Sequence, residues 1–157
     1  MPVARLDRFV AWLVHQQRRR GAGVVARAVL RLWGVDVPRS VAVGPGLCLP
    51  HATTGLVLHP SCRLGRDVTI MHGVTVGRAD VWLTDDEGTR VLIGDGAILG
   101  ANAVVLVRAG ELLEVGAGTI LGAGSVLTSS TGTGEVWAGN PARLVRTLDR
   151  GRPDPVQ

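Results

Sequence analysis

A six-residue repeat of aliphatic residues restricts the fold of this chain more than any other feature. Between residues 64 and 127, Leu, Ile or Val occupies nine positions in three groups, with a step of six inside each group. The positions are Leu64, Ile70, Val76, Ile93, Leu99, Val105, Val115, Leu121 and Leu127. A period of six fits neither an α-helix nor a simple hairpin, and it indicates a short strand and a tight turn that repeat.

Three such units would form one triangular coil of about 18 residues, with the aliphatic side chains stacked inside it. We expect the glycine that often follows the aliphatic residue to supply the backbone freedom that a corner needs. These glycines are Gly65, Gly77, Gly94, Gly100, Gly116 and Gly122. Cys62 lies two positions before Leu64, where a small residue would fill the corner, which favours a structural role over a reactive thiol. The pattern predicts a mainly β protein, a parallel β-helix.

Two interruptions of the repeat predict loops. Val76 and Ile93 are 17 residues apart, and the excess includes the segment RADVWLTDDEGTR. Val105 and Val115 are 10 residues apart, which predicts a smaller excursion near RAGE. Loops that protrude from a rigid repeat often carry function.

The N-terminal segment predicts helices instead of strands. VARLDRFVAWLVHQQRRR has apolar residues at helical spacing, and GAG at 21–23 is expected to break this helix. The apolar positions are Leu6, Phe9, Val10, Leu13 and Val14. VVARAVLRLWG predicts a second helix that stops at Gly34. We therefore expect a helical segment at 1–34, a β-helix domain at 35–147 with a loop at 77–91, and a flexible tail at 148–157.

Composition and charge exclude several classes of protein. The 157 residues are 46% hydrophobic, which is enough for one domain with a core. The net charge is +4, and much of the basic excess lies in the first 31 residues. Aromatic residues make up only 3% of the chain and do not alternate with the basic ones, so we expect no nucleic-acid partner. A solvated basic helix face is the simplest interpretation, and attraction to an anionic membrane or a phosphorylated ligand stays open.

The apolar run FVAWLV and the cysteines also bear on the class of protein. FVAWLV is too short for a transmembrane helix, and the charge order differs from that of a signal peptide, so we expect a cytoplasmic protein. Two cysteines form neither a disulfide framework nor a zinc motif. His15 is expected to be solvated near the end of the first helix.

His51 is the strongest candidate for a catalytic residue. Asp36 precedes it by fifteen residues, close to the length of one coil, so the two are expected on adjacent rungs. A carboxylate that accepts a hydrogen bond from one imidazole nitrogen makes the other nitrogen a better base. From spacing alone, a solvated histidine and an unrelated aspartate remain an alternative.

Asp36, the triplet HAT at 51–53, the six-residue repeat and the segment AGNPARLV together resemble the serine O-acetyltransferases, a family of hexapeptide-repeat acyltransferases. The resemblance covers about residues 36–147 and is closest to compact members without a large helical domain. It implies a left-handed β-helix, His51 as general base and Asp36 as its orienting partner. It further implies direct transfer of acetyl from acetyl-CoA to L-serine or a similar small amino acid, in a homotrimer with sites between subunits.

The resemblance also implies where acetyl-CoA and the acceptor bind. The family places the pantetheine arm along backbone with small side chains, at positions that Gly77, Ala101 and Ala123 match. Arg143 matches the family's Pro-Ala-Arg turn, which implies a place near a CoA phosphate, with a capping role as the alternative.

The chain departs from the family pattern around the acceptor. Pro50 replaces an aspartate before the base, Arg78 replaces a glycine, and His59-Pro60 replaces Gly-Glu. Arg90 stands roughly where the family has a substrate-binding histidine, and His72 replaces a glutamine. We expect Arg90 and His72 to contact the acceptor, with Arg90 able to hold a carboxylate bidentately. A sugar or natural-product hydroxyl or amine therefore remains an alternative acceptor.

Two other classes of function fit parts of the sequence. His51, His59 and His72 could hold a metal, as histidines do in the γ-type carbonic anhydrases, but their gaps of 8 and 13 residues lack that family's short gap. We therefore expect no metal, and His59 is expected to close a corner of the coil. A non-catalytic scaffold is the remaining class, and the retained Asp36 and His51 argue against it.

Overall fold

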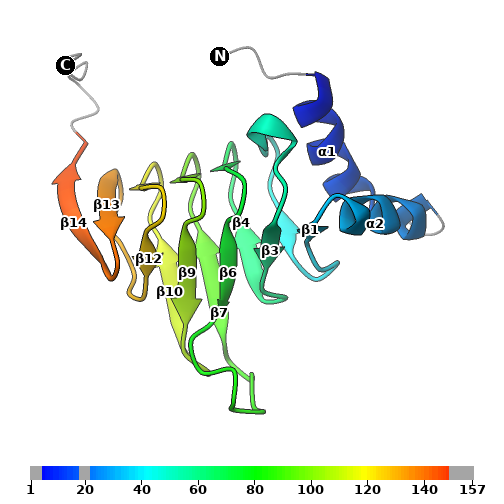
Figure 1. The fold of residues 1–157 in the computed structure, drawn as a ribbon. Helices are drawn as coiled ribbons and strands as arrows, with labels where there is room; N and C mark the ends of the chain where they lie inside the picture. The colour runs from blue at the N-terminus through cyan, green and yellow to red at the C-terminus, as the bar shows by residue number, and fades with distance from the viewer. Residues whose placement is uncertain (1–4, 18–21, 149–157) are drawn as a thin grey trace.

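Two helices precede a prism of short strands in the computed structural model, which describes residues 5–17 and 22–148. α1 (Arg5–Gln16) and α2 (Ala22–Leu32) pack against each other, and α2 also contacts the first strand. Figure 1 shows the helices at one end of the prism and the last strand at the other. No helix in the described ranges is long and apolar enough to cross a membrane.

The strands form three sheets, which we call the first, second and third face. The first face contains β1 (Val35–Asp36), β3 (Leu56–Leu58), β6 (Thr75–Arg78), β9 (Val104–Val107) and β12 (Val126–Leu127). The second contains β2 (Ala42–Val43), β4 (Cys62–Leu64), β7 (Arg90–Ile93) and β10 (Leu112–Val115). The third contains β5 (Thr69–Ile70), β8 (Ile98–Leu99), β11 (Ile120–Leu121), β13 (Glu135–Gly139) and β14 (Ala142–Thr147). Successive strands lie on different faces and pair in parallel with the next coil, except for the antiparallel pair β13 and β14. The predicted parallel β-helix is therefore confirmed.

The repeat supplies the core of the prism. All nine aliphatic residues of the six-residue repeat are buried, with at most 5% of the surface exposed. The residues two positions earlier, Cys62 among them, are buried as well. Because inward-facing side chains alternate with outward-facing ones along a strand, each strand contributes these two positions to the interior.

The glycines that follow the aliphatic residues do not adopt a left-handed corner conformation, the conformation that would need the backbone freedom of glycine. Of these six glycines, all of which the structure describes, none has a positive φ. A Cβ at Gly94 would lie 2.5 Å from the backbone nitrogen of Ala117, so glycine is needed because adjacent coils approach closely there. In six corners a left-handed residue lies three positions after the aliphatic residue. It is Asp67, Gly73, Gly96, Asn102, Gly118 or Gly124.

The helices depart from the predicted boundaries at GAG. α1 ends at Gln16, and the arginines at 18–20 lie outside the described residues. α2 already begins at Ala22 and includes Gly23, where a Cβ would lie 2.5 Å from the carbonyl oxygen of Gln17. Glycine 23 thus permits close packing of the two segments, and Gly34, with φ +72°, follows the end of α2 as predicted.

The apolar face of α1 is only partly buried. Val10, Leu13 and Val14 belong to the core, whereas Leu6 and Phe9 are each 44% exposed. His15 is exposed in the last turn, as predicted.

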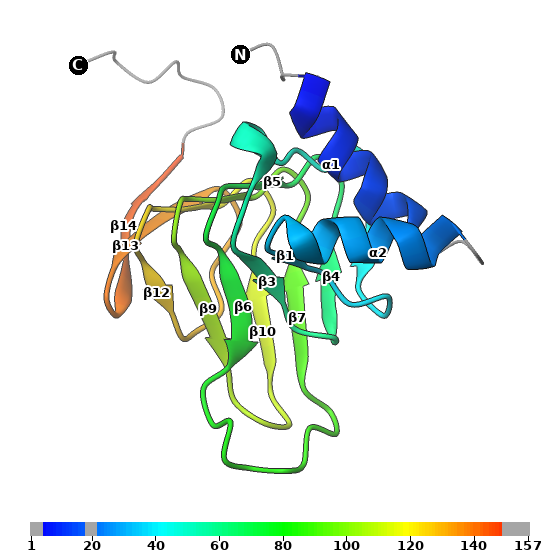
Figure 2. The same cartoon turned by 45° about the vertical axis from the view of Figure 1, so that its right-hand side comes forward.

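Both predicted loops are present. Residues 79–89 form a long loop between β6 and β7, and residues 108–111 form a turn between β9 and β10. Figure 2 shows the two connections projecting from the same edge of the prism. The backbone N–H of Ala109 donates to the carboxylate of Asp80 (2.9 Å), so the shorter turn supports the longer loop. Of the predicted tail, residues 149–157 lie outside the described part of the chain.

Candidate active site

His51 lies in an enlarged corner between the third face and β3. This corner comprises Pro50–Gly55, six residues, whereas the same corner one coil later comprises only the three residues Met71–Gly73. The extra residues form a 3₁₀ turn at Pro50–Ala52, in which His51 has φ 58° and an exposed side chain. The insertion therefore pushes the imidazole out of the prism wall, where a substrate can reach it.

Two contacts hold this corner in place. The buried Thr53 hydroxyl lies 2.9 Å from the carbonyl oxygen of Pro50 and 3.2 Å from that of Ile70, one coil further along. Helix α1 packs against the 3₁₀ turn from outside. Helix α1 thus supports the segment that presents His51.

Asp36 lies on β1, which pairs with β3, and His51 lies in the corner that precedes β3. Asp36 is exposed on β1, and its backbone pairs with Val57 of β3. Within residues 5–17 and 22–148, no hydrogen bond or ion pair joins the Asp36 carboxylate to the His51 imidazole. The orienting hydrogen bond expected for this pair therefore stays a prediction.

Three of the predicted binding residues line one edge of the prism, which we call the His72 edge. His72, Ala101 and Ala123 occupy equivalent corner positions, because Asn102 donates its N–H to His72 and Gly124 donates to Ala101 (2.9 and 2.8 Å). The corner of His51 begins this edge, since Gly73 donates to the carbonyl of Thr54 (2.8 Å). Ala101 is half-buried and Ala123 exposed. The small side chains leave the backbone accessible along the edge.

The other predicted residues lie elsewhere in the same chain. Gly77 is on β6 and pairs with Leu106 of the first face, at the end of the strand next to loop 79–89. Arg90 begins β7 at the other end of that loop and is exposed. Arg143 is exposed on β14, where its Nη1 donates to the backbone of Ala142 (3.0 Å).

Arg78 organises the long loop, a role that the sequence pattern did not reveal. Its Nη1 donates to the carbonyl of Asp85 (2.6 Å), and its Nη2 donates to the carbonyl of Asp80 (2.8 Å) and to that of Leu83. Its Nε lies 3.4 Å from Oδ1 of Asp80, and its Nη1 lies 3.4 Å from Oδ1 of Asp86. The only signal in the sequence was arginine in place of the family's glycine.

His59 connects the loop to the next corner. The corner itself is closed by the N–H of Cys62, which donates to the carbonyl of His59 (2.9 Å), as predicted. Nδ1 of His59 lies 2.8 Å from Oγ of Ser61, and Nε2 lies 3.2 Å from Oδ2 of Asp86. Asp86 is exposed. Slight desolvation opposes ionisation of its carboxyl, but a hydrogen bond from Thr89 and the charges of His59 and Arg78 outweigh this and lower the pKa of the carboxyl.

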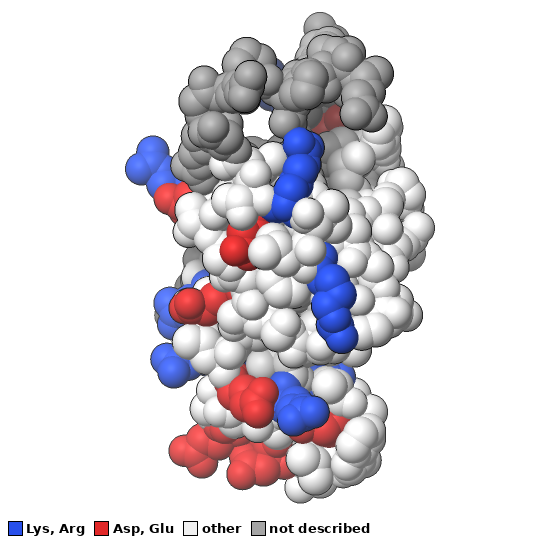
Figure 3. All heavy atoms as spheres, turned by 90° about the vertical axis from the view of Figure 1, so that its left-hand side faces the viewer, with Lys and Arg blue, Asp and Glu red and all other residues white. Residues whose placement is uncertain are grey.

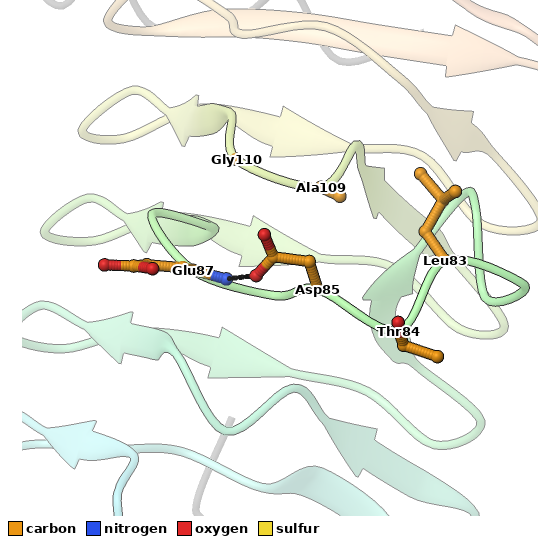
Figure 4. Close-up of a pocket in the computed structure, with 6 residues that line it drawn as sticks. All are labelled: Leu83, Thr84, Asp85, Glu87, Ala109 and Gly110. Atoms are coloured by element: carbon orange, nitrogen blue, oxygen red, sulfur yellow. Dashed lines mark hydrogen bonds between the residues drawn. The ribbon is translucent and has the colours of Figure 1, made fainter.

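The pockets on the loop do not include His51, and one of them has an acidic lining. One pocket of about 310 Å³ lies between the loop and the turn at 108–111. Its lining residues are Leu83, Thr84, Asp85, Glu87, Ala109 and Gly110 (Figure 4). Asp85 accepts the N–H of Glu87 there (2.9 Å), so one acidic side chain shapes the loop itself. Figure 3 shows acidic side chains gathered at the end of the molecule from which this loop projects.

The surroundings of Cys62 and of the three histidines bear on two alternatives, a reactive thiol and a metal site. Burial raises the pKa of the Cys62 thiol to about 12, which agrees with the predicted structural role. His59 lies between the first and second faces, whereas His51 and His72 lie between the third and first. In the described ranges, no three His, Cys, Asp or Glu side chains are grouped to hold a metal ion.

Serine acetyltransferases resemble this chain in both sequence and fold. No protein-family model matches the chain. Serine acetyltransferase 2 of Arabidopsis thaliana is 32% identical over 149 residues, which is 90% of this chain and 42% of the relative. The Mycobacterium tuberculosis serine acetyltransferase is 37% identical over 105 residues, 63% of this chain and 44% of the relative.

The solved serine acetyltransferase of Neisseria gonorrhoeae superposes with a TM-score of 0.75 at 29% identity, covering 92% of this chain and 56% of that one. The chain spans less than half the length of these curated relatives. Its parallel strands form the left-handed β-helix of those proteins. The chain is therefore, over 90% of its length, a homologue of the serine acetyltransferases, which are hexapeptide-repeat acyltransferases.

Proposed function

We propose that the protein transfers an acetyl group from acetyl-CoA to the hydroxyl of L-serine or a similar small amino acid. The observation that carries the proposal is the enlarged corner that presents His51 at the start of the His72 edge. Two solved serine acetyltransferases with the same fold are complexes, one with serine and one with coenzyme A. Neither a metal nor a covalent intermediate is part of the proposal.

His51 acts as the general base in the proposed reaction. Its imidazole takes the proton of the acceptor hydroxyl while the oxygen attacks the thioester carbonyl carbon, and the Asp36 carboxylate orients the ring. Backbone N–H groups stabilise the negative charge on the carbonyl oxygen. The C–S bond then breaks, and the imidazolium protonates the departing thiolate of CoA. Acid–base help of this kind contributes about 10²- to 10⁴-fold to the rate.

The acyl donor lies along small side chains in this proposal. Ala101 and Ala123 line the His72 edge and leave room for a pantetheine arm beside the backbone. Gly77 and Arg143 lie on other parts of the surface and would take part from a neighbouring copy or at the far end of CoA. Sites that combine different faces are a reason to place the reaction between subunits.

A homotrimer is the assembly that we propose. Each face of the prism exposes an aliphatic side chain: Val57 on the first, Leu112 on the second and Ile98 on the third. Packing such prisms side by side removes these apolar surfaces from water.

We also propose that the protein acts in the cytoplasm and divides into a helical segment at 1–34, a β-helix at 35–147 and a tail at 148–157.

The second candidate function is acetyl transfer to a different acceptor. One residue, Arg90, instead supports an amino acid. Arg90 is exposed and makes no ion pair within the described ranges, so it is available to hold the carboxylate of an amino acid. Pro50, however, supplies no carboxylate beside His51, and Arg78 ties the loop to its own chain. These two residues favour the alternative, a sugar or natural-product hydroxyl or amine.

The release of free CoA thiol from acetyl-CoA distinguishes these functions. The protein is incubated with L-serine, other hydroxy amino acids, sugars and amines, beside His51→Ala and the control His15→Ala. Turnover with L-serine that is lost only in His51→Ala supports the first proposal. Turnover with another acceptor but not with L-serine would identify the class of that acceptor as the substrate. If no acceptor gives turnover above that of His51→Ala, the proposal that the protein is an enzyme is wrong. Light scattering tests the trimer separately.

A further inference from the structure

A second concave surface lies on the helical segment, away from the His72 edge. This pocket has a volume of about 460 Å³ and is formed by α2 together with the segment between β1 and β2. Its lining residues are Val24, Arg27, Ala28, Arg31 and Arg39. Figure 1 shows α2 at the opposite end of the prism from β14, which carries Arg143. The pocket is therefore remote from the proposed phosphate contact of acetyl-CoA.

Three arginines from two segments converge on this pocket. Arg27 and Arg31 are one helical turn apart on α2, so their side chains leave the same side of the helix. Arg39 approaches from the other segment and reaches the beginning of α2, where its Nη2 lies 3.1 Å from the Cβ position of residue 23. The fold, and not the sequence spacing, brings Arg39 to the other two.

No described carboxylate neutralises these three charges. The ion pairs in residues 5–17 and 22–148 involve His59 and Arg78, and none involves the arginines of the pocket. α2 contains no acidic residue, and Nε of Arg27 is buried without a hydrogen-bond partner. Like charges around one concavity repel each other, and a buried donor without a partner costs free energy. An anion in the pocket would remove both costs.

We propose that Arg27, Arg31 and Arg39 form a binding site for a phosphate-bearing ligand. The guanidinium group binds phosphate oxygens bidentately, and three positive charges match a phosphomonoester or diphosphate better than a single carboxylate. The volume accommodates a phosphate with a small organic group. The ligand is either a soluble phosphorylated metabolite or the headgroup of an anionic lipid, since Val24 and Leu32 are exposed on the same helix.

Isothermal titration calorimetry with inorganic pyrophosphate, at about 0.15 M ionic strength, tests the soluble source. We expect Arg31→Gln/Arg39→Gln to weaken binding at least tenfold, because two of the three charges are lost. Arg63→Gln/Arg66→Gln is the matched control, since it removes two exposed arginines elsewhere, and it should retain the affinity of the unchanged protein. An equal loss of affinity in both variants would show that net charge alone explains the binding, and would overturn the proposed site.

Sedimentation with vesicles tests the lipid source, using phosphatidylcholine alone and phosphatidylcholine with phosphatidic acid. Binding that requires phosphatidic acid and is lost in Arg31→Gln/Arg39→Gln supports a headgroup. Absence of binding to both pyrophosphate and these vesicles overturns the proposal.

The variant Arg31→Gln/Arg39→Gln should keep the KM for acetyl-CoA, and a raised KM would instead assign the arginines to binding of the acyl donor. Arg31→Gln alone, at an exposed position, serves if the double variant does not fold.

Discussion

Nε2 of His59 lies 3.2 Å from Oδ2 of Asp86, and this contact ties the long loop to a corner of the coil. The same carboxylate also faces the guanidinium of Arg78, which caps three backbone carbonyls of the loop. The loop is thus held by Arg78 at its start and by His59 through Asp86. Its exposed residues Val81 and Trp82 are consequently presented on a supported segment.

Removing the charge of Asp86 should loosen the loop. In Asp86→Asn the ion pairs with His59 and Arg78 are lost, so we expect faster hydrogen exchange and proteolysis within residues 79–89. Glu111→Gln is a suitable control because it removes an exposed carboxylate outside the loop. Unchanged exchange in Asp86→Asn would mean that the backbone contacts of Arg78 suffice.

The same contact should depend on pH. The pKa of Asp86 is lower in the folded protein than its usual value of about 3.9. Its ionised form therefore stabilises the fold at pH values above about 4, and this contribution is lost as the pH falls through the folded pKa. We expect the loop exchange of the unchanged protein to approach that of Asp86→Asn in acid. Hydrogen exchange measured at several pH values, corrected for intrinsic rates, checks this.

His51→Ala should reduce kcat by about 10²- to 10⁴-fold without a loss of stability. The reason is that the imidazole is exposed and is not part of the buried core. Acetyl transfer and thermal unfolding are measured together, with His15→Ala as the control. A large fall in the unfolding temperature would show that His51 serves the corner and not the reaction.

Cys62 should resist alkylation in the folded protein. With a pKa of about 12 the thiolate fraction at pH 8 is about 10⁻⁴, and the side chain is 1% exposed. Iodoacetamide should therefore modify Cys48, which is half-buried, well before Cys62. Mass spectrometry before and after denaturation gives the order of modification, and equal rates for both thiols would contradict the buried setting.

Two glycines in one corner should respond differently to substitution. Gly94→Ala places a Cβ 2.5 Å from the backbone of the next coil and should cost about 1–3 kcal/mol or more. Gly96→Asn adds a side chain where no atom lies within 4 Å, and Asn102 already adopts the same left-handed conformation at the equivalent position. It should cost less than about 1 kcal/mol. Urea unfolding compares the two, and the reverse order would contradict the assignment of close approach to position 94.

The repeat and its interruptions were accessible to sequence analysis for a physical reason. Each coil buries the same positions, so Leu64, Ile70 and Val76 reveal the period without knowledge of distant contacts. The interruptions between Val76 and Ile93 and between Val105 and Val115 locate the two loops by simple counting. The exposed corner of His51 was less accessible, because the three extra residues of Pro50–Gly55 become visible only against the aligned coils.

Contacts between segments distant in sequence required the tertiary structure. Whether a repeat glycine permits a left-handed turn or a close approach depends on what the next coil places beside it, as Ala117 does at Gly94. Asp86 lies 27 residues from His59, and no local pattern predicts that the two side chains meet. Arg39 likewise joins Arg27 only because the chain folds back onto α2. Hydrophobic periodicity is a local property that sequence alone expresses, whereas the partners of polar side chains are decided by the three-dimensional path of the chain.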